Sequence, residues 1–124
     1  MKFLHSMLRV SDPEATVAFF QLLGLEERRR MDNEAGRFTL IFLGVPGDDG
    51  GEIELTWNWD GRDYEIGTAS GHVLGSRDSR RLRPSAGRRR HHHAKPGPMK
   101  HWSTVIAVIR DPIGYPIELI ERAG

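Results

Sequence analysis

Two glutamates and two histidines occur in matching positions in the two halves of the chain. Glu54 stands in EIELTW and Glu118 in PIELIE, so each glutamate lies between an isoleucine and a leucine. His5 and His72 precede these segments at similar separations. Because side chains alternate along a strand, each glutamate should point away from its aliphatic neighbours and from the core that they fill. Two imidazoles and two carboxylates form a suitable donor set for a divalent cation such as zinc, nickel, cobalt or iron.

A less specific interpretation of these four residues is also open. A single glutamate in a strand is usually solvated, and a single histidine is usually a surface or capping residue. The repetition of both residue types at similar spacing favours the metal site. Four protein ligands on a six-coordinate cation would leave two positions for water or substrate.

The first half of the chain must supply the strands that position His5 and Glu54. Residues 3–10 alternate as a strand does, and a helix is predicted to follow. Ser11 or Asp12 can cap this helix, Pro13 suits its first turn, and Gly24 ends it. Three further strands are predicted at residues 26–32, 38–43 and 52–57, with a turn at 45–51.

The second half repeats part of this order. Strands are predicted at residues 71–75, 103–109 and 116–122, with a turn at 111–115. Pro116 lacks a backbone donor, which predicts an edge position or the start of a strand.

The composition excludes several classes of protein. The chain has no cysteine, so it has no disulfide framework, zinc–thiolate site or thiol nucleophile. Its first residues lack the apolar run of a signal peptide, and no segment has the roughly 20 apolar residues that span a bilayer. We therefore expect a cytoplasmic protein that binds neither membrane nor nucleic acid.

One segment does not fit the regular pattern. Residues 76–95 hold eight of the 18 basic residues and one of the 17 acidic ones, leaving 10 basic against 16 acidic residues elsewhere. Their spacing is neither helical nor alternating, so a solvated, partly disordered loop is the leading interpretation. Phosphate or RNA binding by the run RRRHHH (88–93) is an alternative that the acidic remainder disfavours. Three consecutive histidines are poorly placed to chelate one metal.

Several separate segments, in order, resemble a known family. They are FLHSMLRVSDPEATVAFFQLLGLE, GRFTLIFLG, EIELTWNWD, YEIGTASGHV, GPMKHWSTVIAVIRDP and GYPIELIE. These segments resemble glyoxalase I (lactoylglutathione lyase) in its short bacterial form, within the vicinal oxygen chelate superfamily. The resemblance implies an α+β fold of paired βαβββ modules in one glyoxalase-like domain, with the first module at about 1–62 and the second at about 63–124. The resemblance stops after Val73 and resumes at Pro96, so residues 74–95 are expected to perturb the second module; a pair of compensating frameshifts would explain them.

The resemblance also implies roles for particular residues. The positions of the family's four metal ligands are occupied by His5, Glu54, His72 and Glu118, and Glu118 is also at the position of the catalytic base. Arg9 and Asn58 are at positions that contact the glutathione part of the substrate, and Lys100 lies in a loop that closes over it. The implied protein is a homodimer whose sites each take one His–Glu pair from each subunit.

The implied reaction isomerises the hemithioacetal of methylglyoxal and glutathione to S-lactoylglutathione. The metal would stabilise the ene-diolate, and Glu118 would move the proton between neighbouring carbons. The short bacterial form favours nickel, with cobalt or zinc as alternatives. Two other functions stay open: a non-catalytic, ligand-binding or inactive member of the superfamily, and an iron-dependent dioxygenase, which the fourth ligand disfavours.

Overall fold

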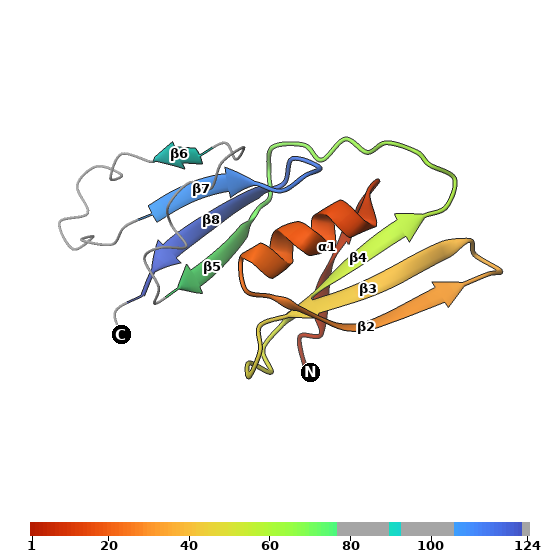
Figure 1. Cartoon of the computed structure of the whole chain (residues 1–124), viewed down its shortest axis with the longest axis horizontal. Helices are drawn as coiled ribbons and strands as arrows, with labels where there is room; N and C mark the ends of the chain where they lie inside the picture. Colours follow the sequence, from red (N-terminus) through yellow and green to blue (C-terminus); the bar gives the residue numbers. More distant parts are fainter. Residues whose placement is uncertain (77–89, 93–105, 123–124) are drawn as a thin grey trace. The chain divides into compact units, whose positions relative to one another are not determined.

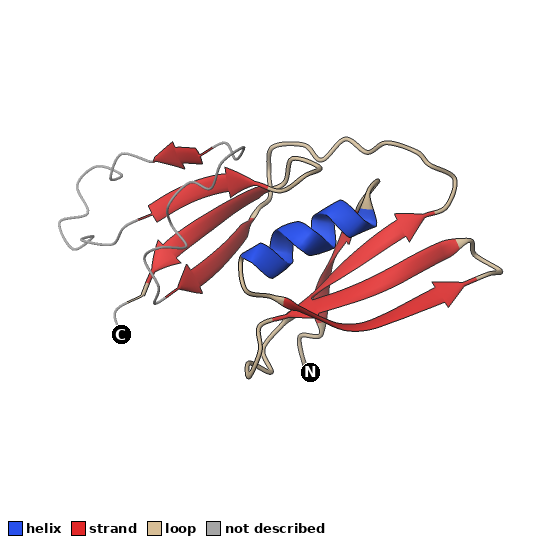
Figure 2. Cartoon of the chain, viewed as in Figure 1, coloured by secondary structure: helices blue, strands red, loops and turns tan. Residues whose placement is uncertain are grey.

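The computed structural model describes residues 1–76, 90–92 and 106–122 (Figure 1). The chain divides into two compact units, Met1–Glu65 and Ile66–Gly124. In the described residues, one helix accompanies eight strands (Figure 2). Each unit holds one four-stranded mixed sheet, which confirms the expected α+β class of paired sheet modules.

The first unit is a complete βαβββ module. It consists of β1 (His5–Arg9), α1 (Pro13–Leu22), β2 (Glu26–Asn33), β3 (Phe38–Gly44) and β4 (Glu52–Asn58). The strand order in the sheet is β1-β4-β3-β2, with β1 and β4 parallel and the other pairs antiparallel. The first and last strands of the module are therefore neighbours, and this brings the segment of His5 beside that of Glu54.

The sequence predicts either Ser11 or Asp12 as the N-cap of α1, and in the structure the cap is Asp12. Asp12 Oδ1 accepts the backbone N–H of Ala15 at 3.1 Å, and this satisfies a donor that the first turn leaves unpaired. Pro13 occupies the first turn, where its missing N–H costs nothing. Gly24 follows the helix with φ of 101°, a left-handed conformation that glycine adopts without strain, which confirms its predicted role.

This cap gives a first testable prediction. Replacement of Asp12 by alanine should lower the free energy of unfolding by about 1 kcal/mol, because the Ala15 N–H loses its acceptor. Urea denaturation followed by circular dichroism measures the change. Ser11→Ala is the matched control, because Ser11 is the other predicted cap and does not cap the helix in the structure. Equal decreases in the free energy of unfolding for both variants would contradict the assignment of Asp12.

The core of the first unit lies between α1 and one face of its sheet. Val17 and Phe20 of α1 are buried, and the sheet contributes the aliphatic residues that alternate along its strands. These are Leu8, Val10, Ile41, Leu43, Ile53 and Leu55. The other face of the sheet carries the intervening side chains, including those of His5 and Glu54.

The second unit repeats the sheet order of the first. Its strands are β5 (His72–Ser76), β6 (Arg90–His92), β7 (Ile106–Arg110) and β8 (Pro116–Glu121). They are arranged as β5-β8-β7-β6, again with the first and last strands parallel. Pro116 begins β8, an inner strand, so the alternative of a strand start is confirmed for this proline.

The expectation of an irregular loop at 76–95 needs one correction. Arg90–His92 form β6, which pairs with β7 in antiparallel register from Arg90 opposite Ile109 to His92 opposite Ala107. A sheet ladder is made by backbone N–H and C=O groups, so the free edge of β7 can recruit a segment that has no apolar alternation. The rest of the expected loop, residues 77–89 and 93–95, lies outside the described residues.

Within the part of the chain that the structure describes, no helix has the length and the apolar character that a membrane span requires.

Candidate metal and substrate site

The structure brings His5 and Glu54 into direct contact. His5 Nε2 lies 2.5 Å from Glu54 Oε2, and the other carboxylate oxygen accepts from Thr56 Oγ1 at 3.2 Å. The register of β1 with β4 explains this contact. His5 is opposite Glu52 and Met7 is opposite Glu54, so the histidine and both glutamates lie on the same face of the sheet.

The two predicted glutathione contacts of the first unit share that face. Arg9 is opposite Thr56 and Phe38 is opposite Asn58, and both positions keep the two-residue alternation that starts at His5 and Glu54. Asn58 Nδ2 donates to Tyr64 Oη at 2.7 Å. The predicted residues of the first unit thus line one sheet face, opposite α1. Lys100, the third predicted contact, lies outside the described residues.

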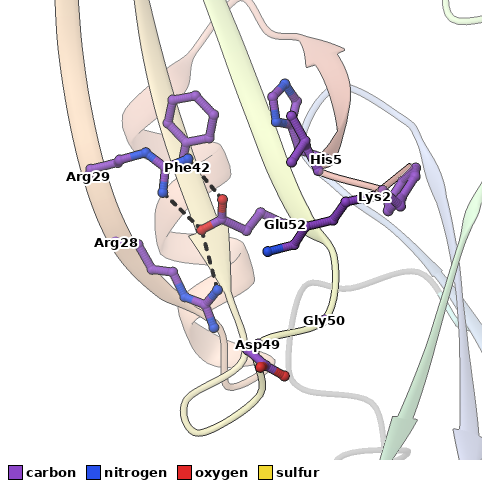
Figure 3. A pocket seen from close by; sticks show the side chains of 10 residues that line it. Lys2, His5, Arg28, Arg29, Phe42, Asp49, Gly50 and Glu52 are labelled. Carbon is purple, nitrogen blue, oxygen red and sulfur yellow. Dashed lines mark hydrogen bonds and ion pairs between the residues drawn. The ribbon is translucent and has the colours of Figure 1, made fainter.

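His5 also packs against an aromatic and basic cluster, shown in Figure 3. The His5 and Phe42 rings meet edge to face, with centroids 5.4 Å apart. The Arg29 guanidinium lies 3.9 Å from the centre of the Phe42 ring and donates to both oxygens of Glu52, at 2.9 and 3.1 Å. The guanidinium thereby fixes the aromatic wall beside His5, and its hydrogen bonds hold the pKa of Glu52 below the usual glutamate value.

A β-bulge explains how two adjacent arginines reach the same carboxylate. Neighbouring residues of a regular strand point to opposite faces, but the register of β2 with β3 shifts between Glu27 and Arg29. Arg28 is the extra residue, and it donates to Glu52 Oε2 at 3.3 Å and to the carbonyl of Val45 at 2.8 Å. The bulge therefore joins the β3–β4 loop to the wall of the pocket that includes His5.

Loss of the Arg29 guanidinium should lower the free energy of unfolding by a small but measurable amount. Arg29→Gln removes the paired hydrogen bonds to Glu52 and the contact over Phe42, so the free energy of unfolding should fall by about 0.5–1 kcal/mol, the range for exposed cation–π and ion pairs. Urea denaturation measures it. Arg62→Gln is the control, because Arg62 pairs with Asp60 on the surface; an equal loss there would show that the Phe42 contact contributes nothing.

The second predicted pair is arranged differently. His72 and Glu118 both line a pocket at the start of β5 and β8, but no hydrogen bond or ion pair joins these two described residues. His72 is opposite Ile117 in the ladder, while Val73 is opposite Glu118. His72 and Glu118 consequently lie on opposite faces of the second sheet.

His72 instead lies near Asp111, a residue for which the sequence predicts only a place in a turn. Asp111 Oδ1 accepts the backbone N–H groups of Ile113, Gly114 and Tyr115, and Oδ2 is buried with no hydrogen-bond partner among the described residues. Burial lowers the pKa of His72, and the charge of Asp111 partly opposes that shift. Burial likewise raises the pKa of Asp111. The sequence held no signal for this proximity, because it depends on strand pairing.

The donor set of the first unit fits a divalent cation. An imidazole nitrogen and a carboxylate oxygen face each other on the sheet face that α1 does not cover, with Thr56 orienting the carboxylate. In the second unit His72 and half-buried Glu118 both line one pocket, but they lie on opposite faces of the sheet. No group of three or more potential ligands occurs among the residues that the structure describes.

This combination of fold and site defines a class of protein. Residues 2–119 match the family model described as the Glyoxalase/Bleomycin resistance protein/Dioxygenase superfamily, and the chain belongs to that superfamily. Within it, the chain is 42% identical to lactoylglutathione lyase of Haemophilus influenzae and 41% identical to that of Neisseria meningitidis serogroup A, covering 98% of this chain and 93% and 91% of those proteins. The structure is also similar to a crystal structure of a glyoxalase I variant from Zea mays, with a TM-score of 0.81 and 35% identity, over 99% of this chain and 45% of the maize chain.

Proposed function

We propose that this chain is a metal-dependent lyase that converts the hemithioacetal of methylglyoxal and glutathione into S-lactoylglutathione. The observation that carries the proposal is the His5–Glu54 contact on the face of the first sheet that α1 does not cover. It occurs in a chain that is about 40% identical to bacterial lactoylglutathione lyases over nearly its whole length. Glutathione is then the co-substrate, and the product is a thioester.

His5, Glu54 and Glu118 would hold the cation, whereas His72, the fourth predicted ligand, lies on the sheet face opposite to that of Glu118. Nickel is the preferred cation, and cobalt or zinc would also suit imidazole and carboxylate donors. A divalent cation, when bound, would polarise the oxygens of the hemithioacetal and stabilise the negative charge that develops as carbon loses its proton.

Glu118 would act as the base of the reaction. Its strand alternates so that Ile117 and Leu119 are buried while Glu118 stays half-exposed beside a pocket. A carboxylate at that position can take a proton from one carbon of the substrate and return it to the neighbouring carbon. The two transfers leave the protein unchanged and isomerise the hemithioacetal.

Three basic or polar residues would bind the glutathione part. Arg9 would pair with a glutathione carboxylate, because its planar fork matches two oxygens at once. Asn58, held by Tyr64, would hydrogen-bond the peptide portion, and Lys100 would close over the substrate. The proposed assembly is a homodimer in which each site takes His5 and Glu54 from one subunit and Glu118 from the other.

The test is reconstitution of the metal-stripped chain. Nickel, cobalt and zinc are added separately to purified protein with methylglyoxal and glutathione, and thioester absorbance is followed. Turnover that appears only with metal, and that Glu118→Gln lowers by about 10²–10⁴-fold, supports the proposal. A soluble, folded protein without turnover under any of these metals would reject it.

A second candidate is a non-catalytic or inactive member of the superfamily. The observation that favours it is the separation of His72 and Glu118 onto opposite sheet faces. Such a protein would bind a small ligand without metal-dependent chemistry. Binding of S-hexylglutathione by calorimetry, in a chain that shows no turnover, would select this candidate over the lyase.

A further inference from the structure

The two sheets differ in the register of one strand. β7 pairs with β8 as β3 pairs with β4, since Val108 is opposite Glu118 and Phe42 is opposite Glu54. The parallel pairs do not correspond. His5 is opposite Glu52, two residues before Glu54, whereas His72 is opposite Ile117, one residue before Glu118. β5 is therefore displaced by one residue relative to the position that β1 holds in the first sheet.

The burial of the β5 side chains agrees with this displaced register. Val73, on the face of Glu118, is 62% exposed, while His72 and Leu74 on the other face are half-buried. The face that carries His72 also carries Ile117 of β8, which is fully buried. In β7 the buried residues Ala107 and Ile109 lie on this face, and the next residue in their two-residue alternation is Asp111, which is also buried. The proximity of His72 to Asp111 follows from this placement.

The cause is the spacing of aliphatic residues after each histidine. In β1 the buried residues Leu8 and Val10 are an odd number of positions after His5, so the histidine points away from the core. In β5 the larger aliphatic residue, Leu74, is two positions after His72, and an even spacing places both on one face. Burying Leu74 turns His72 to the core side. Among the described strands, β5 lies at the edge of its sheet and pairs with β8 alone, so the displacement disturbs no other described ladder.

From this we infer that the register of β5 withholds His72 from the Glu118 face, so His72 does not contribute to divalent-cation binding unless β5 shifts by one residue. The inference rests on the proposed function, which supplies the cation site. Compared with β1, the segment after His72 is one residue short between Val73 and Leu74. This difference in spacing places His72 and Glu118 on opposite faces of the sheet. An alanine inserted there would restore the odd spacing found in β1.

The first experiment measures the register without metal. The chain has no cysteine, so engineered pairs report one strand contact each. Val73→Cys with Glu118→Cys should form a disulfide readily on mild oxidation, because these residues are opposite each other. Val73→Cys with Ile117→Cys should not, because Ile117 points to the other face. Cross-linking of the second pair and not the first would overturn the inference.

The second experiment titrates metal-stripped protein with Ni²⁺ alone by calorimetry. His5→Gln should weaken binding by at least about 10-fold, whereas His72→Gln should change the dissociation constant by less than about 2-fold. In the chain carrying the inserted alanine, His72→Gln should weaken binding by at least about 10-fold. Equal losses from His5→Gln and His72→Gln in the uninserted chain would overturn the inference.

A point substitution tests the register without inserting a residue. Leu74→Ser leaves Val73 as the aliphatic residue of the strand, so β5 should shift and His72 should begin to bind Ni²⁺. Val73→Ser is the matched control and should keep the displaced register. Failure of the proposed function looks different. A chain that binds Ni²⁺ through His5 but never turns over the hemithioacetal would reject the lyase and leave the register inference intact.

Discussion

Glu54→Gln should weaken Ni²⁺ binding by at least about 10-fold and lower metal-dependent turnover with it. The amide keeps the shape of the side chain and one oxygen for Thr56, but it removes the negative charge that faces His5 Nε2 at 2.5 Å. A neutral oxygen is a weaker ligand and no longer offsets the charge of a cation. Calorimetric titration and thioester absorbance measure the two effects.

Glu34→Gln is the matched control for this substitution. Glu34 is exposed in the turn between β2 and β3, away from the face that carries His5. The control should bind Ni²⁺ and turn over as the unsubstituted chain does. If Glu54→Gln behaved like its control, Glu54 would not be a ligand, and the contact with His5 would be a purely structural ion pair.

Phe20→Ala should destabilise the chain more than any other substitution described above, by about 3–5 kcal/mol. Phe20 of α1 is fully buried and packs edge to face against Phe19, with ring centroids 5.4 Å apart. Its removal leaves a cavity between the helix and the sheet. Because small domains are stable by only about 5–15 kcal/mol, a large fraction of the variant should be unfolded at temperatures where the unsubstituted chain is still folded.

The measurement is thermal and urea denaturation, compared with Leu22→Ala in the same helix. Leu22 is 65% exposed, so its truncation should change the free energy of unfolding by less than about 0.5 kcal/mol. Similar losses in the two variants would contradict a core centred on Phe20. Ni²⁺ binding by the folded fraction of Phe20→Ala should be retained, because the helix packs on the face opposite His5.

The sequence determined the local structure of this protein and the faces of its strands. Asp12, Pro13 and Gly24 set the ends of α1, because capping and left-handed conformations depend on neighbouring residues. The Ile-Glu-Leu repeats fixed the direction of Glu54 and Glu118, because side-chain alternation is a local property with a period of two. The similarity of the two sheets followed from the same repeated pattern.

The tertiary structure decided which residues stand opposite each other. The bulge at Arg28 lets two adjacent arginines reach Glu52, and the open edge of β7 recruits Arg90–His92 as a strand. The displacement of β5 separates His72 from Glu118, although both carry the residue types that the sequence matched to His5 and Glu54. The register of a strand is one of several possible pairings with a distant segment, and the burial of an aliphatic side chain determines which pairing forms. A change of one residue in the spacing between a histidine and that aliphatic residue therefore moves the histidine to the other face of the sheet.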